Sequence, residues 1–350
     1  MSYGDLHDRL DDFETDARRV VALPDGSVDH RYALSGAGGR RVRTADDFAR
    51  QLTRGSRAFA LEPLGVEPGG QAVNASVQAH ALGDETLLVG HLDHPVLADL
   101  PFETRSMGSP AEIRVVSLVE NDLLLSEPGP TDDWLLEELL AVVDWERVVG
   151  ADGLCCANWV SVRGLTAVID RLAAAPPDDR LAVVVDPGPI DAVEPAALGG
   201  LFEALSRVAG ADAPLEVVLS VNPRELAAAA AAVDGTKAES GDDSSPDGER
   251  TRERAATLRS ALDIAGVVSH GSDAAVGATR GDTVAVEMLD VTTIERTTGA
   301  GDRFSAGLAC ALARDWPLET ALALGNACAA HFVETGETAD PAALRSRLED

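Results

Sequence analysis

From residue 134 onward, short apolar segments alternate with segments of helical character, and this alternation constrains the fold more than any other feature. The apolar segments cover residues 181–186, 215–221 and 264–269, and they alternate with helical segments such as 166–174 and the alanine run 227–232. Strands that alternate with helices form a parallel sheet with helices on both faces. The pattern therefore predicts an α/β fold with a mainly parallel sheet.

Polar residues follow several of these predicted strands at their carboxyl ends. Asp186, Asn222 and the pair His270-Gly271 each end an apolar segment. Ligands of open parallel α/β sheets bind at the carboxyl ends of the strands. We therefore expect these residues to lie near a binding site.

The first 130 residues contain shorter elements. They are a strand 20–23, a helix 45–52, a helix 72–82, a strand 86–90, and a hairpin of 113–119 and 123–126 with its turn at Glu120-Asn121-Asp122. Pro24-Asp25-Gly26 is a turn after the first strand, Thr44 is the expected cap of the first helix, and Gly83 ends the second helix. The hairpin interrupts the alternation and indicates a separate β element.

Residues 234–254 are polar, charged and rich in Gly, Ser and Pro. Such a segment buries too little apolar surface to offset the entropy that is lost on ordering. We therefore predict a flexible acidic insertion at this place.

The chain is strongly acidic. It has 59 Asp and Glu against 29 Lys and Arg, a formal net charge of −30, and Lys237 is its one lysine. A surface of this kind repels nucleic acids and anionic lipids, which bind to basic patches. Because salt screens repulsion between carboxylates, the composition indicates a halophilic protein, with an acidic mesophilic protein as the alternative.

The cysteines and the N-terminus indicate where the protein is found. Cys155, Cys156, Cys310 and Cys328 lie in apolar segments and lack the spacing of a C-x-x-C pair or a zinc site, so we predict that they are core residues. The acidic N-terminal segment has no apolar stretch typical of a signal peptide, and no window reaches the length that spans a bilayer. We expect a soluble, cytoplasmic protein without membrane or nucleic-acid partners.

The strongest chemical signal is Thr297-Thr298-Gly299-Ala300-Gly301-Asp302, followed by a helix of small residues at 304–312. A Gly-rich turn at a helix N-terminus presents free backbone N–H groups and partial positive charge, which favour phosphate. A carboxylate beside that turn is typical of a reaction in which a hydroxyl loses a proton as a phosphoryl group arrives. The alternative is that Asp302 only stabilises the helix N-terminus, but its setting in Gly-Ala-Gly-Asp favours catalysis.

Two further motifs are less specific. In Gly69-Gly70-(x)3-Asn74 the glycines allow close backbone approach and the asparagine offers hydrogen bonds to sugar hydroxyls, although a Gly-Gly pair before a helix is also an ordinary turn. Asn222-(x)2-Glu225 follows a predicted strand. It fits a Mg²⁺ site that acts through water, and it fits a capping box at a helix start; both interpretations remain open and are compatible.

These motifs, in this order, resemble those of the PfkB/ribokinase family of carbohydrate kinases. The first signature is similar to Gly69-Gly70-(x)3-Asn74 running to Leu82-Gly83, the second to residues 297–304, and Asn222-(x)2-Glu225 to the N-x-x-E element of the family. The resemblance covers about residues 18–340. It implies a single kinase domain over residues 1–350 with a three-layer α/β/α core and a small β lid at about 28–45 and 106–128.

The resemblance also implies roles for individual residues. Asp302 is the expected catalytic base, and the expected anion hole is formed by Gly299, Ala300 and Gly301. The expected sugar-binding residues are Gly69, Gly70, Asn74 and Asp29, the last within Val28-Asp29-His30 at the end of the first strand. The expected nucleotide-binding residues are Asn222, Glu225, Ser269, Gly271 and Asn326. Of these, Asn222 and Glu225 are also expected to position Mg²⁺ through water, and Asn326 to lie near the adenine.

The implied activity is the ATP- and Mg²⁺-dependent phosphorylation of a sugar hydroxyl. The N-x-x-E element and the length favour ATP. A nucleoside kinase and an ADP-dependent sugar kinase of the same superfamily are alternatives, and so is a non-catalytic sugar-binding regulator with the same fold. The intact turn 299–302 argues against the regulator. A small-molecule sugar is the expected partner, and the lid allows a homodimer.

Three positions depart from the family pattern. Arg296 stands where the family usually has Asp, in a region that binds a monovalent cation in many members, so activation by K⁺ is in doubt. Ala274 replaces a second glycine after Gly271, and Pro24-Asp25 replaces a glycine that the family usually has on the first strand. These changes affect the binding site more than the fold.

Overall fold

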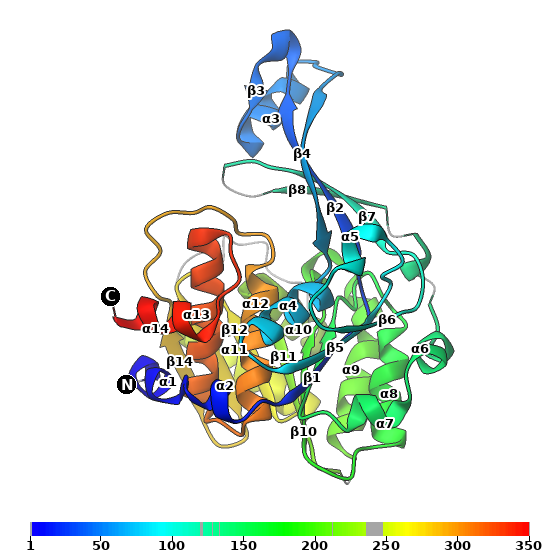
Figure 1. Cartoon of the computed structure of the whole chain (residues 1–350), viewed down its shortest axis with the longest axis vertical. Coiled ribbons are helices and arrows are strands. Elements are labelled where there is room, and N and C mark those ends of the chain that lie inside the picture. The colour runs from blue at the N-terminus through cyan, green and yellow to red at the C-terminus, as the bar shows by residue number, and fades with distance from the viewer. Residues whose placement is uncertain are drawn as a thin grey trace.

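The structure is a computed structural model that describes residues 2–119, 122–127, 129–132, 134–211, 213–235 and 248–349. Figure 1 shows a layered body from which a smaller sheet projects at one end. The α/β class and the mainly parallel sheet that the sequence predicts are confirmed.

The large sheet has nine strands within the described residues, in the order β14-β13-β12-β11-β10-β9-β1-β5-β6. Their bounds are β1 Arg19–Leu23, β5 Glu85–Gly90, β6 Glu103–Ser106, β9 Gly153–Ala157, β10 Leu181–Asp186, β11 Leu215–Val221, β12 Gly266–His270, β13 Ala274–Thr279 and β14 Thr283–Glu287. The pairs from β6 to β12 are parallel, whereas β13 runs antiparallel to β12 and β14. The carboxyl ends of β1, β9, β10, β11 and β12 therefore meet at one edge, where ligands of such sheets bind.

Helices cover both faces of the large sheet. One face carries α6 Leu136–Val142, α7 Trp145–Val149, α8 Leu165–Ala174, α9 Pro195–Ala209, α10 Pro223–Asp234 and α11 Gly248–Leu262. The other carries α1 Ser2–Arg9, α2 Asp12–Thr15, α4 Gln71–Ala81, α5 Pro95–Ala98, α12 Ala300–Ala313, α13 Leu318–Thr335 and α14 Pro341–Glu349. Successive strand residues point to opposite faces, so the free, buried Cys155 and Cys156 of β9 pack into different apolar clusters, and the prediction that the cysteines are core residues is confirmed.

Small residues bring α12 and α13 into close contact. A Cβ added to Gly307 of α12 would lie 3.2 Å from the Cα of Gly325 on α13. A Cβ added to Gly325 would lie 2.7 Å from the ring of Phe304. The close approach of the two helices therefore requires both glycines. The packing against α13 fixes the position of α12 and with it the position of its N-terminus.

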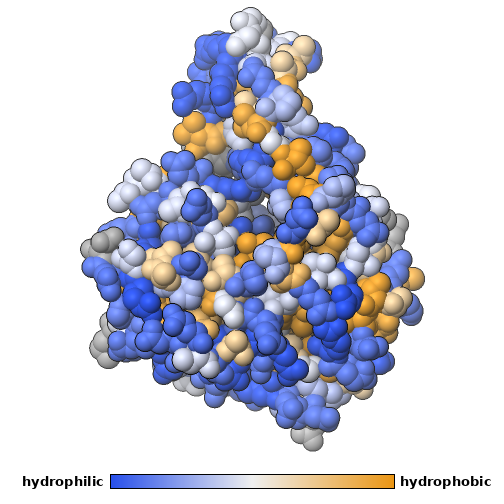
Figure 2. All heavy atoms as spheres, viewed as in Figure 1, coloured by the Kyte–Doolittle hydropathy of each residue, from blue (hydrophilic) through white to orange (hydrophobic). Residues whose placement is uncertain are grey.

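The smaller sheet, called the small sheet below, consists of β2 Ser27–Ser35, β3 Arg41–Val42, β4 Ala60–Gly69, β7 Ala111–Val116 and β8 Leu123–Glu127. β2 pairs with β4 along one side and with β7 and β3 along the other, and α3 Ala45–Thr53 packs at its tip (Figure 1). The side chains of β4 are exposed over nearly its whole length. Figure 2 shows a largely hydrophilic face with hydrophobic patches on the part that the small sheet forms.

Most predicted elements are confirmed, including the strands 181–186 and 215–221, the hairpin of β7 and β8, and the cap of α3, where Thr44 accepts a hydrogen bond from the N–H of Asp47. Residues Glu120 and Asn121 of the expected turn lie outside the described residues. β4 has no counterpart among the predicted elements, because it contains Pro63 and Pro68, and proline is tolerated in strands mainly at edges.

Two expectations are wrong in part. Val28-Asp29-His30 does not end the first strand: β1 stops at Leu23 before the turn 24–26, and Asp29 belongs to β2 of the small sheet. Of the expected insertion 234–254, Asp234 ends α10 and residues 248–254 begin α11, because the periodic Ala255, Leu258 and Leu262 anchor that helix. Residues 236–247 lie outside the described residues. No helix in the described part of the chain has the length and apolar character needed to cross a bilayer.

Candidate active site

The turn before α12 presents free backbone N–H groups. Gly299 occupies the N-cap with a φ of 95°, a left-handed conformation that glycine adopts without strain. The N–H of Ala300 donates to Thr297 O at 3.1 Å and that of Arg303 to Gly299 O at 3.3 Å. The N–H groups of Gly301 and Asp302 have no backbone acceptor among the described residues. Two free donors at a helix N-terminus make this turn an anion-binding site.

The carboxylate of Asp302 lies beside this turn and is held by α4. Asn74 Nδ2 donates to Asp302 Oδ2 at 2.7 Å, and Gln71 Nε2 donates to Asp302 Oδ1 at 3.2 Å. The structure therefore brings the predicted Asn74 and Asp302 together across 228 positions of sequence. The same Gln71 nitrogen also donates to Asp186 Oδ1 at 3.2 Å, so one amide bridges two carboxylates.

Asp186, at the carboxyl end of β10, is buried next to Asp302. Its carboxylate accepts hydrogen bonds from Ser305 Oγ at 2.8 Å and from the N–H of Gly188 at 3.3 Å. Burial, reinforced by the negative charge of Asp302, raises the pKa of Asp186 to about 6. A cavity of about 10 Å³, room for about one water molecule, lies between these carboxylates and Gln71.

Asp25, in the turn after β1, caps the helix that holds Asp302. Its carboxylate accepts hydrogen bonds from the N–H groups of Ala72 at 2.7 Å and Gln71 at 3.0 Å, and from Asn158 Nδ2 at 2.8 Å. Burial raises the pKa of Asp25, while the donors from Ala72 and Asn158 oppose this shift. From the sequence, Asp25 is predicted as a turn residue that departs from the family pattern, and Gln71 carries no prediction of its own. The sequence signal for a site role of Asp25 is its place in the turn after a strand, and that for Gln71 is its place directly after Gly69-Gly70.

The predicted sugar-binding residues Asp29, Gly69 and Gly70 lie together where the small sheet joins the body. Ser27 Oγ donates to Asp29 Oδ1 at 2.7 Å, and burial raises the pKa of Asp29 while Arg296 opposes this shift. Asp29 Oδ1 lies so close to Gly69 that a Cβ added there would be 2.1 Å from it. Gly70, with a φ of 105°, is the N-cap of α4.

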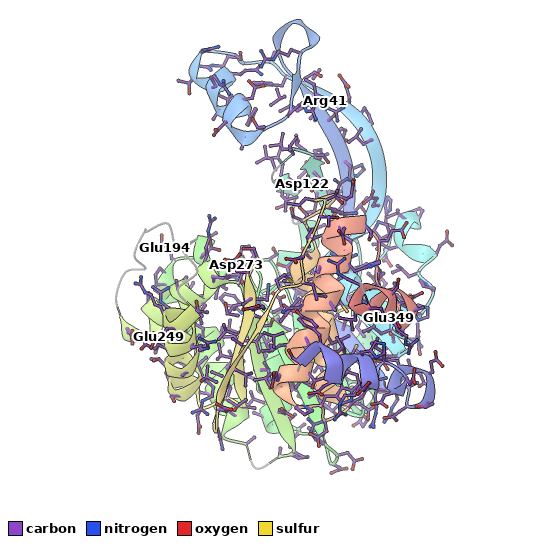
Figure 3. The ribbon with its side chains drawn as sticks, turned by 90° about the vertical axis from the view of Figure 1, so that its left-hand side faces the viewer. Arg41, Asp122, Glu194, Glu249, Asp273 and Glu349 are labelled. Carbon is purple, nitrogen blue, oxygen red and sulfur yellow. The ribbon has the colours of Figure 1, made fainter. Side chains whose placement is uncertain are left out.

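Two contacts tie the small sheet to the segment before the anion-binding turn. Thr298 Oγ1 donates to Asp122 Oδ2 at 2.9 Å, and Arg296 Nη1 donates to Glu67 Oε2 at 2.9 Å. Figure 3 shows Asp122 where the small sheet approaches the body. The small sheet thus lies against the turn in this structure, and Arg296 forms an ion pair with it.

Asn222 and Glu225 form a capping box at the start of α10. The N–H of Glu225 donates to Asn222 Oδ1 at 3.0 Å, and the N–H of Asn222 donates to Glu225 Oε2 at 2.7 Å, so the capping interpretation is confirmed. Burial, followed by the charge of Asp186, raises the pKa of Glu225 to about 8. Within the described residues no cluster of three His, Cys, Asp or Glu could hold a metal directly. The oxygens of this box fit hydrogen bonds to the water molecules of a metal ion rather than direct ligation.

The remaining nucleotide-binding candidates lie at neighbouring strand ends or beyond them. Ser269 pairs with Val221 in register, which places it beside Asn222, and its buried Oγ has no partner in the described residues. Gly271 follows β12, and its N–H donates to Ala274 O at 3.1 Å. Asn326 is fully buried in α13, where its Nδ2 donates to Val286 O at 3.1 Å and to Tyr3 Oη at 3.2 Å. The structure therefore gathers Ser269 and Gly271 with Asn222 but separates Asn326 from them.

Comparison with known proteins identifies the family. The family model of prokaryotic ketohexokinase matches residues 39–350. A ketohexokinase of Haloferax volcanii is 29% identical over 329 residues, which cover 85% of this chain and 80% of that protein.

Solved structures show the same fold. Ribokinase from Thermotoga maritima superimposes with a TM-score of 0.67 at 16% identity, over 95% of this chain and 100% of that chain. Arabidopsis thaliana ribokinase complexed with ribose and ATP has a TM-score of 0.65 at 16% identity, over 95% of this chain and 99% of that chain. A Burkholderia thailandensis nucleoside kinase in complex with inosine has a TM-score of 0.64 at 16% identity, over 95% of this chain and 96% of that chain. This chain is an enzyme of the prokaryotic ketohexokinase family, and with it of the PfkB/ribokinase carbohydrate kinases.

Proposed function

We propose that this sugar kinase transfers the γ-phosphoryl group of ATP, in the presence of Mg²⁺, to a hydroxyl of a ketohexose. The observation that carries the proposal is the placement of the Asp302 carboxylate beside the free N–H groups of Gly301 and Asp302. The ketohexose is suggested by the matching family and by the Haloferax volcanii relative.

In this mechanism Asp302 accepts the proton of the attacking hydroxyl. The amides of Asn74 and Gln71 donate to its two oxygens, so its lone pairs are fixed in direction before the substrate arrives. The turn of Gly299, Ala300 and Gly301 offers the free backbone N–H groups of Gly301 and Asp302 to the incoming phosphoryl oxygens, where charge develops in the transition state. Because proton transfer and anion binding lie within one helical turn, both act on the same reacting centre.

The sugar is held where the small sheet meets the body. Asp29 offers carboxylate oxygens to sugar hydroxyls, and Gly69 and Gly70 leave the backbone open to a close approach. Asn74 adds an amide that faces both the sugar and Asp302. The contacts of Asp122 and Glu67 with residues 298 and 296 support the interpretation of the small sheet as a lid that excludes water.

The nucleotide is placed along the ends of β11 and β12. Ser269 and Gly271 would contact the phosphates or ribose of a bound nucleotide, and the Asn222–Glu225 box would hold Mg²⁺ through hydrogen bonds to water molecules. Mg²⁺, when bound with the nucleotide, neutralises charge on the phosphate oxygens. Asn326 acts indirectly, because it fixes the end of β14 near the expected adenine position.

Two further properties belong to the same proposal. Arg296 places a permanent cation in the region where many family members bind a monovalent ion, so K⁺ is not required as an activator. Exposed Leu61, Leu64 and Val66 on β4, with Leu124 and Leu125 on β8, give the small sheet an apolar surface that fits a homodimer through the lid. Light scattering in molar KCl tests the dimer.

The experiment is a coupled phosphoryl-transfer assay in molar KCl with Mg²⁺. It tests ATP and ADP against ketohexoses, aldoses, sugar phosphates and nucleosides, with Asp302→Asn as the inactive control. We expect turnover with ATP and a ketohexose, reduced at least about 10²-fold in the variant. Turnover confined to a nucleoside or to ADP would refute the substrate or the donor, and near-normal turnover of Asp302→Asn would refute the base.

A further inference from the structure

Arg303, the residue after the proposed base, is a buried cation without a carboxylate partner among the described residues. Arg303 is only 6% exposed. Its Nη1 donates to Gly299 O at 3.1 Å, and its guanidinium lies 4.0 Å from the ring centre of Phe332. Its Nε has no hydrogen-bond acceptor in the described residues. One carbonyl and one ring face are weak compensation for a desolvated charge.

The other buried arginine of the described residues shows what full compensation involves. Arg314 binds both oxygens of Asp84, at 2.6 and 3.0 Å, and the carbonyl oxygens of Asp16 and Cys310. The chain has twice as many acidic as basic residues, 59 against 29, so carboxylates are abundant. An arginine left without one in such a chain indicates that its counter-charge comes from outside the chain.

The position of Arg303 points to the source of that charge. Its Nη1 lies directly behind Gly299, where an added Cβ would approach it to 2.8 Å. The same turn carries the free N–H groups of Gly301 and Asp302. Arg296 lies near the same Phe332 ring, at 5.5 Å, but it is already paired with Glu67. Arg303 is therefore the buried positive charge at the anion-binding turn that has no hydrogen bond to a carboxylate among the described residues, and the neighbouring Asp302 carboxylate offsets it only through space.

We propose that Arg303 is a positioning residue for phosphoryl transfer: its guanidinium holds the Gly299 carbonyl away from the anion and adds a fixed positive charge behind the turn. The inference rests on the proposed function and extends it. Because the charge is desolvated before the reaction, it is not weakened by water that must reorganise. Burial lowers the pKa of Arg303 to about 10, so the residue remains charged at neutral pH.

The same arrangement predicts opposite effects on stability and on turnover. Replacement of an uncompensated buried cation by an apolar side chain of similar volume is neutral or stabilising for the fold. Its loss from the anion site weakens phosphate binding and the transition state. A residue with a purely structural role would instead lower stability when it is replaced.

The test compares Arg303→Met, Arg303→Lys and the matched surface control Arg207→Met, whose arginine pairs with exposed Asp170 and Glu203. Three quantities are measured at constant ionic strength: the unliganded melting temperature, its rise on addition of inorganic phosphate, and kcat and KM for ATP and a ketohexose. For Arg303→Met we expect an unchanged or higher melting temperature, loss of the phosphate-induced rise, and a kcat lowered about 10- to 100-fold. KM for the sugar should change little, because Arg303 faces the turn and not the sugar.

Arg303→Lys separates charge from shape. We expect it to keep part of the phosphate-induced rise and a kcat between those of the wild type and Arg303→Met, because it keeps the charge but not the planar fork. The inference is refuted if Arg303→Met keeps the phosphate-induced rise and the kcat of the Arg207→Met control. It is also refuted if Arg303→Met unfolds while Arg303→Lys, which keeps the charge, is folded but shows no phosphate-induced rise. Absence of turnover in the wild-type protein would refute the proposed function, whereas the phosphate response would still test Arg303.

Discussion

Asp186 makes the fold sensitive to pH, and its replacement by asparagine tests this directly. Its pKa rises from 3.8 to about 6 on folding because the side chain is buried next to Asp302. A folded-state pKa above the unfolded value means that the bound proton stabilises the fold. This stability is fully present below about pH 3.8 and is lost as the pH rises through about 6.

The size of the effect follows from the two pKa values. The difference of 6 − 3.8, about 2.2 pH units, corresponds to about 3 kcal/mol lost by pH 8, of which about 1.6 kcal/mol is already lost at pH 5. An asparagine does not titrate, so the variant is free of this loss. Compared with the wild type, Asp186→Asn should therefore gain about 1.4 kcal/mol between about pH 5 and pH 8.

The hydrogen bonds around Asp186 tolerate the amide. The new oxygen can accept from Gln71 and Gly188, and Ser305 can turn its hydroxyl to accept from the new nitrogen while it donates to Ser220. The absolute stability of the variant depends on these bonds, but the change with pH does not.

Urea unfolding followed by circular dichroism in molar KCl, at about pH 5 and about pH 8, measures the effect. Asp99→Asn, at an exposed position after α5, controls for the removal of one negative charge from a chain of net charge −30. An offset between wild type and Asp186→Asn that is the same at both pH values would refute the reasoning, and so would an equal pH-dependent gain in Asp99→Asn.

Three further predictions concern charge and packing. The melting temperature should rise from about 0.1 to 1 M KCl, because the Debye length shrinks from about 10 to 3 Å and repulsion within the acidic surface is screened; a falling melting temperature would contradict the halophilic interpretation. Gly69→Ala should raise KM for the sugar at least several-fold because its Cβ would displace the Asp29 carboxylate, whereas Gly65→Ala, with open space around it on the same strand, should not; equal KM values would contradict the placement of Asp29. Arg314→Met should cost about 3–5 kcal/mol in urea unfolding, because it leaves the fully buried Asp84 without its cation; a loss below about 1 kcal/mol would show that the pair is not buried in solution.

The sequence predicts those parts of the molecule that depend on local pattern. The strands 181–186 and 215–221 were found with their bounds, because each is a continuous apolar run that ends in a polar residue. Asp302 and Asn74 were singled out because glycines mark the turns that carry them. The family resemblance implies a separate role for each of them, whereas the hydrogen bond between them is seen only in the structure.

The remainder depends on contacts between distant residues. Gln71 reaches Asp302 across 231 positions and Asn158 reaches Asp25 across 133, and no local pattern announces either bond. β4 contains two prolines and exposes both faces, so it has neither the alternation nor the composition of an ordinary strand. Its partner β2 supplies the backbone hydrogen bonds that its sequence does not suggest.

The way in which the small sheet is attached has a mechanical consequence. β2 leaves the body only three residues after β1, through the turn that contains Asp25, and β4 returns to the body with Gly70 alone between it and α4. No flexible linker is present at either crossing to absorb a displacement. A movement of the small sheet must therefore be transmitted to α4, whose Gln71 and Asn74 fix the direction of the Asp302 carboxylate. The position of the small sheet over the sugar and the orientation of the Asp302 carboxylate are therefore mechanically coupled.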